Sequence, residues 1–345
     1  MLILIVVYEL FIACMVVIIS FMVILEIRQP NFPSISPSVS IIVPIKGLDI
    51  SWQENVKSLT QLEYDNIKEI VYVVDSDDLD TYNALESYGC KVIFTEKICE
   101  NCSGKIRAEI TGILHTCGDF IVFVDSDIRV ERNWLTELVK PLNESTASTT
   151  FSWPKPINTD FRSLIRASFW ILGFDLHIFA NGFLWGGSMA ISRKILINGG
   201  IDYLKDKIYD DGSLTTFLKK NKINIKFVNR AICYNIYNGN EDFMQWMSRQ
   251  ISVIRKYAPL TASFFSFNFI LFLLSILFGL FNGDFIFIAV PLSWIIKEVL
   301  YSLKFHTKSL KIPLLSMLSI MIAFVLLIIN FNQKKVKWRG KEYDI

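Results

Sequence analysis

Two aspartates, Asp125 and Asp127, directly follow the apolar run from Phe120 to Val124. A short apolar run bounded by Gly118 and by acids is typical of a strand buried on both faces of a parallel sheet. Ligands of open α/β sheets bind just beyond the carboxyl ends of the strands. Two carboxylates in that place suit a hard divalent cation, Mg²⁺ or Mn²⁺, which in turn suits a diphosphate. An isolated pair of this kind is more often two solvated acids in a turn, so the rest of the chain must decide.

A second acid cluster supports the site. Asp75, Asp77 and Asp78 follow the apolar run from Ile70 to Val74, which also reads as a buried strand. Because the carboxyl ends of parallel strands meet at one edge of a sheet, these carboxylates should converge with Asp125. A structural protein has no reason to gather like charges at one edge of a sheet. A site that binds a nucleotide together with a metal ion does have such a reason.

The elements that must position these acids alternate between strand and helix, which predicts a doubly wound α/β fold. A first strand begins at Val39 and is closed by Pro44, with Lys46 just beyond it. The other predicted strands are 91–95, 189–192 and 223–234, and a helix is predicted from Gly104 to His115, with Lys105 in its first turn.

Further polar residues stand at element boundaries. Asp210 and Asp211 precede a helix-like stretch, where acids can also be plain helix caps. Gly186 and Gly187 would let a substrate or backbone approach closely. An amphipathic helix ending near Pro259 then carries Trp246, Arg249 and Gln250 within one turn.

The composition predicts a membrane protein. The chain has 345 residues, of which 52% are hydrophobic, and the apolar excess is at its two ends. Leu2 to Leu25 is long enough to span a bilayer and is preceded by no Lys or Arg, whereas Arg28 and Lys46 follow it. The positive-inside rule then places the middle domain in the cytoplasm. The expected domains are an anchor at 1–27, a catalytic domain at 28–260 and a membrane domain at 261–345. A net charge of +2 is too weak to indicate nucleic acid.

Three C-terminal apolar runs, 261–281, 285–303 and 312–331, are each near spanning length. Three full spans would place the basic tail outside, against the positive-inside rule, so either one run is re-entrant or the tail is an exception. Lys297 and Glu298 lie inside the second run; adjacent helical residues make a poor ion pair, and Lys297 could snorkel to the interface. The apolar segment 161–179 is predicted to be an interfacial helix, with a core helix as the alternative.

The six cysteines give little support for a metal site. Cys99 and Cys102 form one C-x-x-C without a second pair, so zinc is not expected. Cys90, Cys117 and Cys233 stand in apolar or strand-like surroundings and are predicted to be buried thiols of a domain in a reducing, cytosol-facing environment.

Taken in order, the segments "PIKGLD", "DSDDLD", "GKIRAEI", "DSDIRV" and "GGSMAISRKIL" resemble the inverting GT-A glycosyltransferases, most closely the ceramide glucosyltransferase type. The resemblance covers about 39–259, with a similar membrane layout on both sides. It implies a Rossmann-like GT-A domain, a nucleotide-sugar donor such as a UDP-sugar, and a divalent metal, Mg²⁺ or Mn²⁺.

The resemblance also implies residue roles. Asp211 would be the catalytic base, with Asp210 in place of the family's usual Glu, and Asp127 would bind the metal with help from Asp125. In the family's final motif only Arg249 is kept, and Trp246 and Gln250 stand in place of the usual residues. Elsewhere in the chain, Ala108 stands where an Asn is common. These departures concern the acceptor side. The residues expected around the donor are Pro44, Lys46, Asp75, Asp77, Lys105, Asp125, Trp246 and Gln250.

The expected reaction is an in-line attack by an acceptor hydroxyl on the anomeric carbon, which inverts that centre. Asp211 would take the proton, the metal would neutralise the leaving diphosphate, and Arg249 would add a fixed positive charge. The apolar segments indicate a lipid acceptor such as ceramide, diacylglycerol or polyprenyl phosphate. A processive polysaccharide synthase and a non-catalytic membrane scaffold are the alternatives.

Overall fold

The structure is a computed structural model that describes residues 2–27, 32–180, 182–238, 243–307, 309–332, 335–338 and 341–344. The start of the predicted linker, 28–31, and parts of the basic tail lie outside the described residues. The chain forms two compact units. The α/β unit contains 30–155 and 180–238, and the membrane unit contains 1–29, 156–179 and 239–345.

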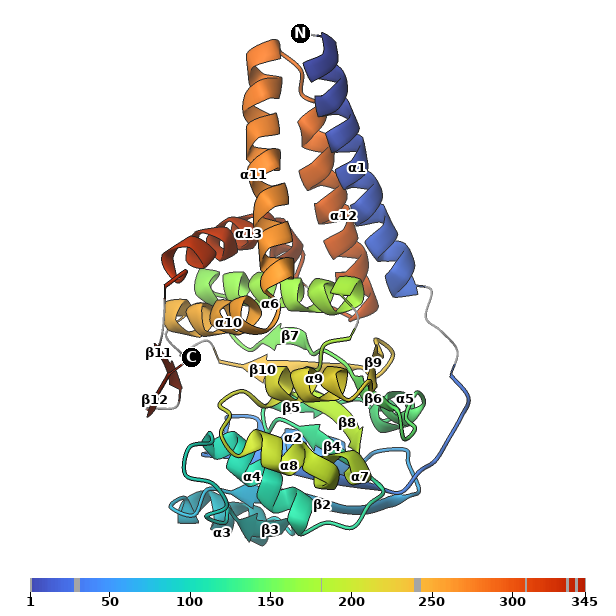
Figure 1. The fold of residues 1–345 in the computed structure, drawn as a ribbon, viewed down its shortest axis with the longest axis vertical. Helices are drawn as coiled ribbons and strands as arrows, with labels where there is room; N and C mark the ends of the chain where they lie inside the picture. The colour runs from blue at the N-terminus through green and yellow to red at the C-terminus, as the bar shows by residue number, and fades with distance from the viewer. Residues whose placement is uncertain are drawn as a thin grey trace. The chain divides into compact units, whose positions relative to one another are not determined.

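The α/β unit is built on a seven-stranded sheet of order β3-β2-β1-β4-β8-β6-β9 (Figure 1). The first four strands in this order are parallel, and β8 is antiparallel to both of its neighbours. This mixed α/β, Rossmann-like sheet confirms the predicted fold class. The strands are β1 (Val39–Ile45), β2 (Ile67–Val74), β3 (Lys91–Phe94), β4 (Phe120–Val124), β6 (Thr146–Thr149), β8 (Ser188–Ser192) and β9 (Asn224–Phe227).

Helix α4 (Gly104–Leu114) packs closely against the centre of this sheet. Its residues Ile106, Ile110 and Ile113 are fully buried in the core that Ile42 of β1 also joins. A Cβ on Gly112 would lie 2.9 Å from Cδ1 of Ile42, so only glycine permits this approach. The other helices of the unit are α2 (Trp52–Thr60), α3 (Leu79–Ser87), α5 (Trp134–Val139), α7 (Arg193–Ile195), η1 (Leu196–Gly200), α8 (Ile201–Leu204) and α9 (Asp210–Lys220).

A three-stranded sheet, of order β5-β10-β7, completes the unit. Its strands are β5 (Ile128–Val130), β7 (Trp153–Pro156) and β10 (Cys233–Tyr237). The single strand predicted over 223–234 was wrong, because the chain turns between β9 and β10. There the Ala231 N–H donates to the Val228 carbonyl at 3.2 Å. The turn allows the chain to leave one sheet and join the other.

The membrane unit is helical. It contains α1 (Leu2–Ile27), α6 (Phe161–Ala180), α10 (Phe243–Tyr257), α11 (Pro259–Asn282), η2 (Ile286–Ile288), α12 (Ala289–Lys304), α13 (Lys311–Ile329) and the hairpin β11 (Lys335–Trp338) and β12 (Lys341–Asp344). Four segments are long and apolar enough to cross a membrane: 2–27, 259–282, 286–304 and 311–329. One is N-terminal and three are C-terminal, in agreement with the predicted layout.

Helix α6 is a core helix of its unit, so the prediction that it lies exposed at an interface was wrong. Ile165, Ile171 and Phe174 are almost fully buried, and Arg166 is only 8% exposed. The Arg166 guanidinium lies 4.4 Å from the centre of the Trp246 ring. The helix is therefore surrounded by protein on most sides, and several of its polar residues, Arg166 and Asp175 among them, are buried as well.

The interpretation of Lys297 also changes. Its side chain is fully buried, so it does not snorkel. Its Nζ lies 2.5 Å from Oδ2 of Asp175 on α6 and 2.9 Å from Oε1 of Glu298. Lys297 and Glu298 therefore interact although they are adjacent in the helix, because the Lys297 ammonium lies between the carboxyl groups of Asp175 and Glu298. Lys297 thus joins α12 to α6.

Candidate active site

The carboxyl ends of β1 and β2 bring Lys46 to Asp75, as the sequence predicted for this edge of the sheet. Lys46 Nζ lies 2.6 Å from Oδ2 of Asp75 and 3.4 Å from Oδ1 of Asp77. Asp77 is the more exposed of the two acids. A Cβ on Gly104 would lie 3.9 Å from Oδ2 of Asp75, so the start of α4 adjoins this ion pair.

Lys105 links two of the acid clusters. Its Nζ lies 2.7 Å from Oδ1 of Asp125 and 3.0 Å from Oδ2 of Asp210, and it donates a hydrogen bond to the Gly186 carbonyl at 3.3 Å. Burial alone would lower the pKa of Lys105, but the charges of Asp125 and Asp210 raise it well above its ordinary value. Lys105 is therefore a fixed cation at the centre of the site.

Gly186 is the position that lets these groups meet. A Cβ there would overlap the Asp210 carboxylate and lie 2.9 Å from Lys105 Nζ. The close approach foreseen for this glycine is thus made by Asp210 and Lys105.

Asp211 lies in the first turn of α9, beside Gly186. Its Oδ2 accepts a hydrogen bond from the Gly186 N–H at 3.3 Å, and its Oδ1 accepts one from the Gly212 N–H at 2.6 Å. Desolvation by burial and the charge of Asp210 raise the pKa of Asp211 to about 7. A carboxyl group with such a pKa can take a proton near neutral pH.

Asp127 and Asp125 are the carboxylates that would hold a divalent metal. Asp127 accepts a hydrogen bond from Asn235 on β10, with 2.7 Å between Nδ2 and Oδ2, and this orients the carboxylate. No group of three His, Cys, Asp or Glu side chains in the described ranges could hold a metal ion by itself. The two carboxylates fit Mg²⁺ or Mn²⁺, which proteins often bind through one or two carboxylates plus substrate phosphates.

Two residues of the site were missed by sequence reasoning. Glu109 lies one turn after Lys105 on α4 and is fully buried, with 4.0 Å between its Oε1 and Lys105 Nζ. Burial and the charge of Asp210 raise the pKa of the Glu109 carboxyl well above its usual range. The i, i+4 spacing from Lys105 was a usable signal for Glu109. Asn235 had no such signal, because it contacts Asp127 across 108 residues.

For the other predicted site residues, none of the described contacts links them to the Lys105 cluster. Pro44 is buried within β1, opposite Val73. Trp246, Arg249 and Gln250 lie on α10 in the membrane unit. Trp246 is 7% exposed and its ring centre is 5.4 Å from that of Trp170. A packing role explains this burial, and the donor contacts suggested for these residues stay predictions.

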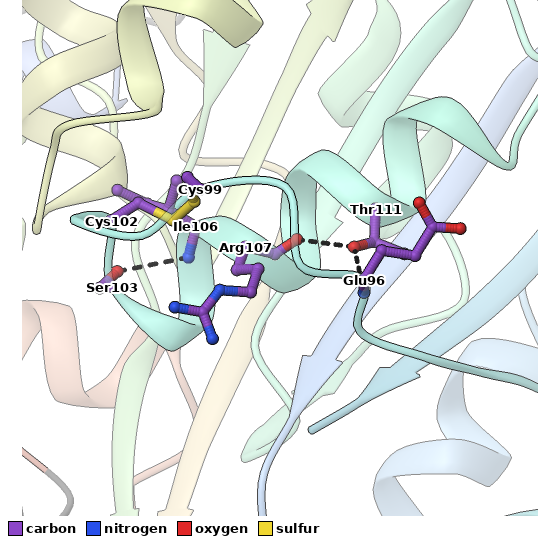
Figure 2. Close-up of a disulfide and its surroundings, with 7 residues drawn as sticks. All are labelled: Glu96, Cys99, Cys102, Ser103, Ile106, Arg107 and Thr111. Atoms are coloured by element: carbon purple, nitrogen blue, oxygen red, sulfur yellow. Dashed lines mark hydrogen bonds between the residues drawn. A yellow bond between two sulfur atoms is a disulfide. The ribbon is translucent and has the colours of Figure 1, made fainter. Parts of the chain in front are cut away.

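A disulfide between Cys99 and Cys102 lies in the loop that leads into α4 (Figure 2). Ser103 caps the helix, with 3.3 Å between the Ile106 nitrogen and Ser103 Oγ. The pairing was not predicted, and it runs against the reducing environment expected for this domain, because disulfides are rare in reducing compartments. Of the cysteines predicted to be buried, Cys233 is buried, Cys90 is half-buried and Cys117 is exposed, so the prediction was wrong for Cys117.

A Rossmann-like sheet in which Lys46 pairs with the acids after β2, and Lys105 pairs with the acids after β4 and at the start of α9, is the arrangement of a GT-A glycosyltransferase. Comparison with protein families agrees: the model of glycosyl transferase family 21 matches residues 3–345. The chain belongs to this family, the ceramide glucosyltransferase type that the motifs resemble.

The individual proteins that resemble this chain share only a low sequence identity or a short matching segment with it. An N-acetylglucosaminyltransferase of Neorhizobium galegae is 30% identical over 138 residues, which cover 39% of this chain and only 32% of that protein. The mannosyltransferase PcManGT from Pyrobaculum calidifontis, solved with GDP-Man and Mn²⁺, has a TM-score of 0.51 at 14% identity. That match covers 92% of this chain and 98% of the other, and at this identity it shows a shared fold.

Proposed function

We propose that the protein is a metal-dependent, inverting glycosyltransferase that moves a sugar from a nucleotide-sugar, a UDP-hexose, to a lipid acceptor. The observation that carries the proposal is the Lys105 cluster. Lys105 fixes Asp125 and Asp210 beside Asp211, beyond the carboxyl ends of β1, β2 and β4. Ligands of α/β sheets bind at such an edge.

The donor occupies this edge. Asp75 and Asp77, steadied by Lys46, face the nucleoside, and Lys105 lies near the diphosphate. Asp127 and Asp125 would hold the divalent ion, which would supply Lewis-acid neutralisation of the leaving nucleoside diphosphate. The Asn235 hydrogen bond keeps Asp127 oriented for this purpose.

Asp211 is the general base. Its pKa of about 7 leaves a useful fraction of carboxylate at neutral pH and makes that carboxylate basic enough to accept a hydroxyl proton. The attacking hydroxyl then displaces the diphosphate in one step. The product therefore has the opposite anomeric configuration from the donor.

The acceptor is a lipid of the ceramide, diacylglycerol or polyprenyl phosphate kind. Four helices of spanning length support an acceptor that resides in the bilayer. Arg28 and Lys46, which follow α1, favour a cytoplasmic catalytic unit. The lipid head group would then enter from the cytoplasmic leaflet.

The test uses purified full-length protein in lipid nanodiscs with Mn²⁺. Labelled UDP-glucose, UDP-galactose and UDP-N-acetylglucosamine are offered with each of the three acceptor lipids. Asp127→Asn should lose metal-dependent donor binding, whereas Asp211→Asn should keep donor binding and lower transfer by about 10²–10⁴-fold.

Asp202→Asn is the matched control, because Asp202 forms a surface pair with Lys205 on α8. It should behave as the wild type. Donor binding with a polymeric product would favour a processive synthase, and absence of donor binding would favour a scaffold. If both Asp127→Asn and Asp211→Asn transferred sugar at the wild-type rate, these residues would not form the active site.

A further inference from the structure

Helix α13 has the length and composition of a membrane span, but its ends can be located from contacts within the membrane unit. A helix that crosses a bilayer has its two ends on opposite sides. The positions of both ends of α13 relative to α1, α11 and α12 therefore decide whether it crosses.

One end of the helical bundle is marked by α1 and α12. Glu26, in the last turn of α1, forms an ion pair with Lys304 at the end of α12. Tyr301 also donates a hydrogen bond to the Met22 carbonyl at 3.2 Å. Helix α13 begins at Lys311, seven residues after Lys304, so its first turn starts from this end.

The opposite end of the bundle is marked by the turn between α11 and α12. Gly283, with a φ of 69°, ends α11, and η2 begins three residues later. Tyr8 of α1 accepts a hydrogen bond from the Phe287 N–H at 3.2 Å. Since α11 and α12 are joined here, the start of α11 at Pro259 must lie at the same end as Lys304.

The last turn of α13 returns to that same end. Arg255, four residues before Pro259, donates hydrogen bonds to the carbonyls of Asn330 and Phe331. Both ends of α13 are thus fixed at the end of the bundle where α1 and α12 finish. In Figure 1, α13 lies across the direction of α1, α11 and α12.

The two faces of α13 differ in what they contact. On one face, Ser168 of α6 donates to the Ile312 carbonyl at 2.7 Å, and Ser319 donates to the Ile165 carbonyl at 3.3 Å. The same face contributes Ala323 and Leu326 to the cluster with α6 and α10. The opposite face is apolar and exposed: Leu314, Leu318, Met321, Val325 and Ile328.

We propose that α13 does not cross the membrane but lies within the leaflet next to the end of α1, with its exposed apolar face against lipid acyl chains. The chain then crosses three times, and its basic tail returns to the side on which the linker to β1 begins. The charges agree: Lys304 and Lys311 are at this end, whereas the opposite turn holds Asp284 and no Lys or Arg. This arrangement satisfies the positive-inside rule.

The number of crossings can be counted from the two termini of the full chain. Fusions of a fluorescent protein, which matures only in the cytosol, and of alkaline phosphatase, active only outside it, are made at each terminus in a bacterial host. Three crossings place the termini on opposite sides, so the two ends should give opposite reporter signals. Matching signals at both ends mean an even number of crossings and would overturn the proposal.

Photo-crosslinking in native membranes tests which molecules contact the exposed apolar face of α13. A benzophenone amino acid at Leu318 or Val325 should give adducts with lipid. The same probe at Ala323, on the buried face, should give adducts within the chain. Adducts between two copies of the protein, or labelling of Leu318→Cys by a water-soluble maleimide, would show that this face does not contact acyl chains.

Discussion

Asp211 connects the geometry of the site to a measurable pH dependence. Its carboxyl group can accept a proton only when ionised, and its pKa is raised to about 7. The rate of transfer should therefore rise with pH through about 7 and then level off. We would measure single-turnover transfer from about pH 5.5 to 8.5 at saturating metal. A rate that stays flat across pH 7 would show that another group is the base.

Glu109 should act on the reaction by positioning Asp210. Burial and the charge of Asp210 raise the pKa of the Glu109 carboxyl well above its usual range, which favours its protonated form, and a protonated Glu109 can donate a hydrogen bond to Asp210. Glu109→Gln still offers a donor to Asp210 and should retain most of the transfer rate. Glu109→Leu leaves Asp210 without that donor, at a cost of about 1–3 kcal/mol, so transfer should fall about 10-fold or more.

Transfer rates and thermal unfolding of the two Glu109 variants are measured together. Folding is intact if both variants melt near the wild-type temperature, and the difference in rate then reports on positioning. Equal rates in the Gln and Leu variants would exclude the hydrogen bond to Asp210 as the cause.

At the scale of elements, the connection between α12 and α6 should dominate the stability of the membrane unit. Lys297 is enclosed by Asp175 and Glu298, and its Nζ lies 3.7 Å from the centre of the Trp294 ring. Lys297→Met leaves an uncompensated buried carboxylate and should cost about 3–5 kcal/mol. Thermal unfolding in detergent should show a lower midpoint.

A second substitution tests whether the unpaired charge causes the loss of stability in Lys297→Met. Asp175→Asn combined with Lys297→Met removes both charges and should recover much of the lost stability. The exposed Lys205, paired with Asp202, provides the control, because its loss should cost little. A double variant as unstable as Lys297→Met would point to packing instead.

The elements of the α/β unit were largely predictable, since β2, β4 and α4 carry their own local signals. Apolar runs ended by acids located the strands, and a helix start before Lys105 located α4. For α6, the sequence left an interface and a core position open, because Arg162 and Arg166 share one face of a helix that is otherwise largely apolar. The junction of β9 and β10 was missed because a tight turn inside an apolar stretch leaves a weak pattern.

At the scale of the whole molecule, Asp75 and Asp77 pair with Lys46, whereas Asp125 and Asp210 meet at Lys105, and these partners could not be foreseen. Lys105 reaches Asp210 from 105 residues away, and Lys297 reaches Asp175 across 122 residues. Such pairs depend on strand order and helix packing, which no local pattern encodes. The sequence thus located the edge of the sheet where these acids lie, whereas the ion pairs they form could be seen only in the folded chain.

The place of β8 in the sheet bears on how the protein is made. Most of the residues expected to hold the donor, from Pro44 to Asp127, are translated before β8, whereas Asp210, Asp211, Trp246 and Gln250 follow it. During synthesis β1, β2, β3 and β4 can pair while the base is still inside the ribosome. Antiparallel insertion of β8 beside β4 then brings α9 to Lys105. A nascent chain should therefore acquire the ability to bind a nucleotide before it acquires the ability to transfer a sugar.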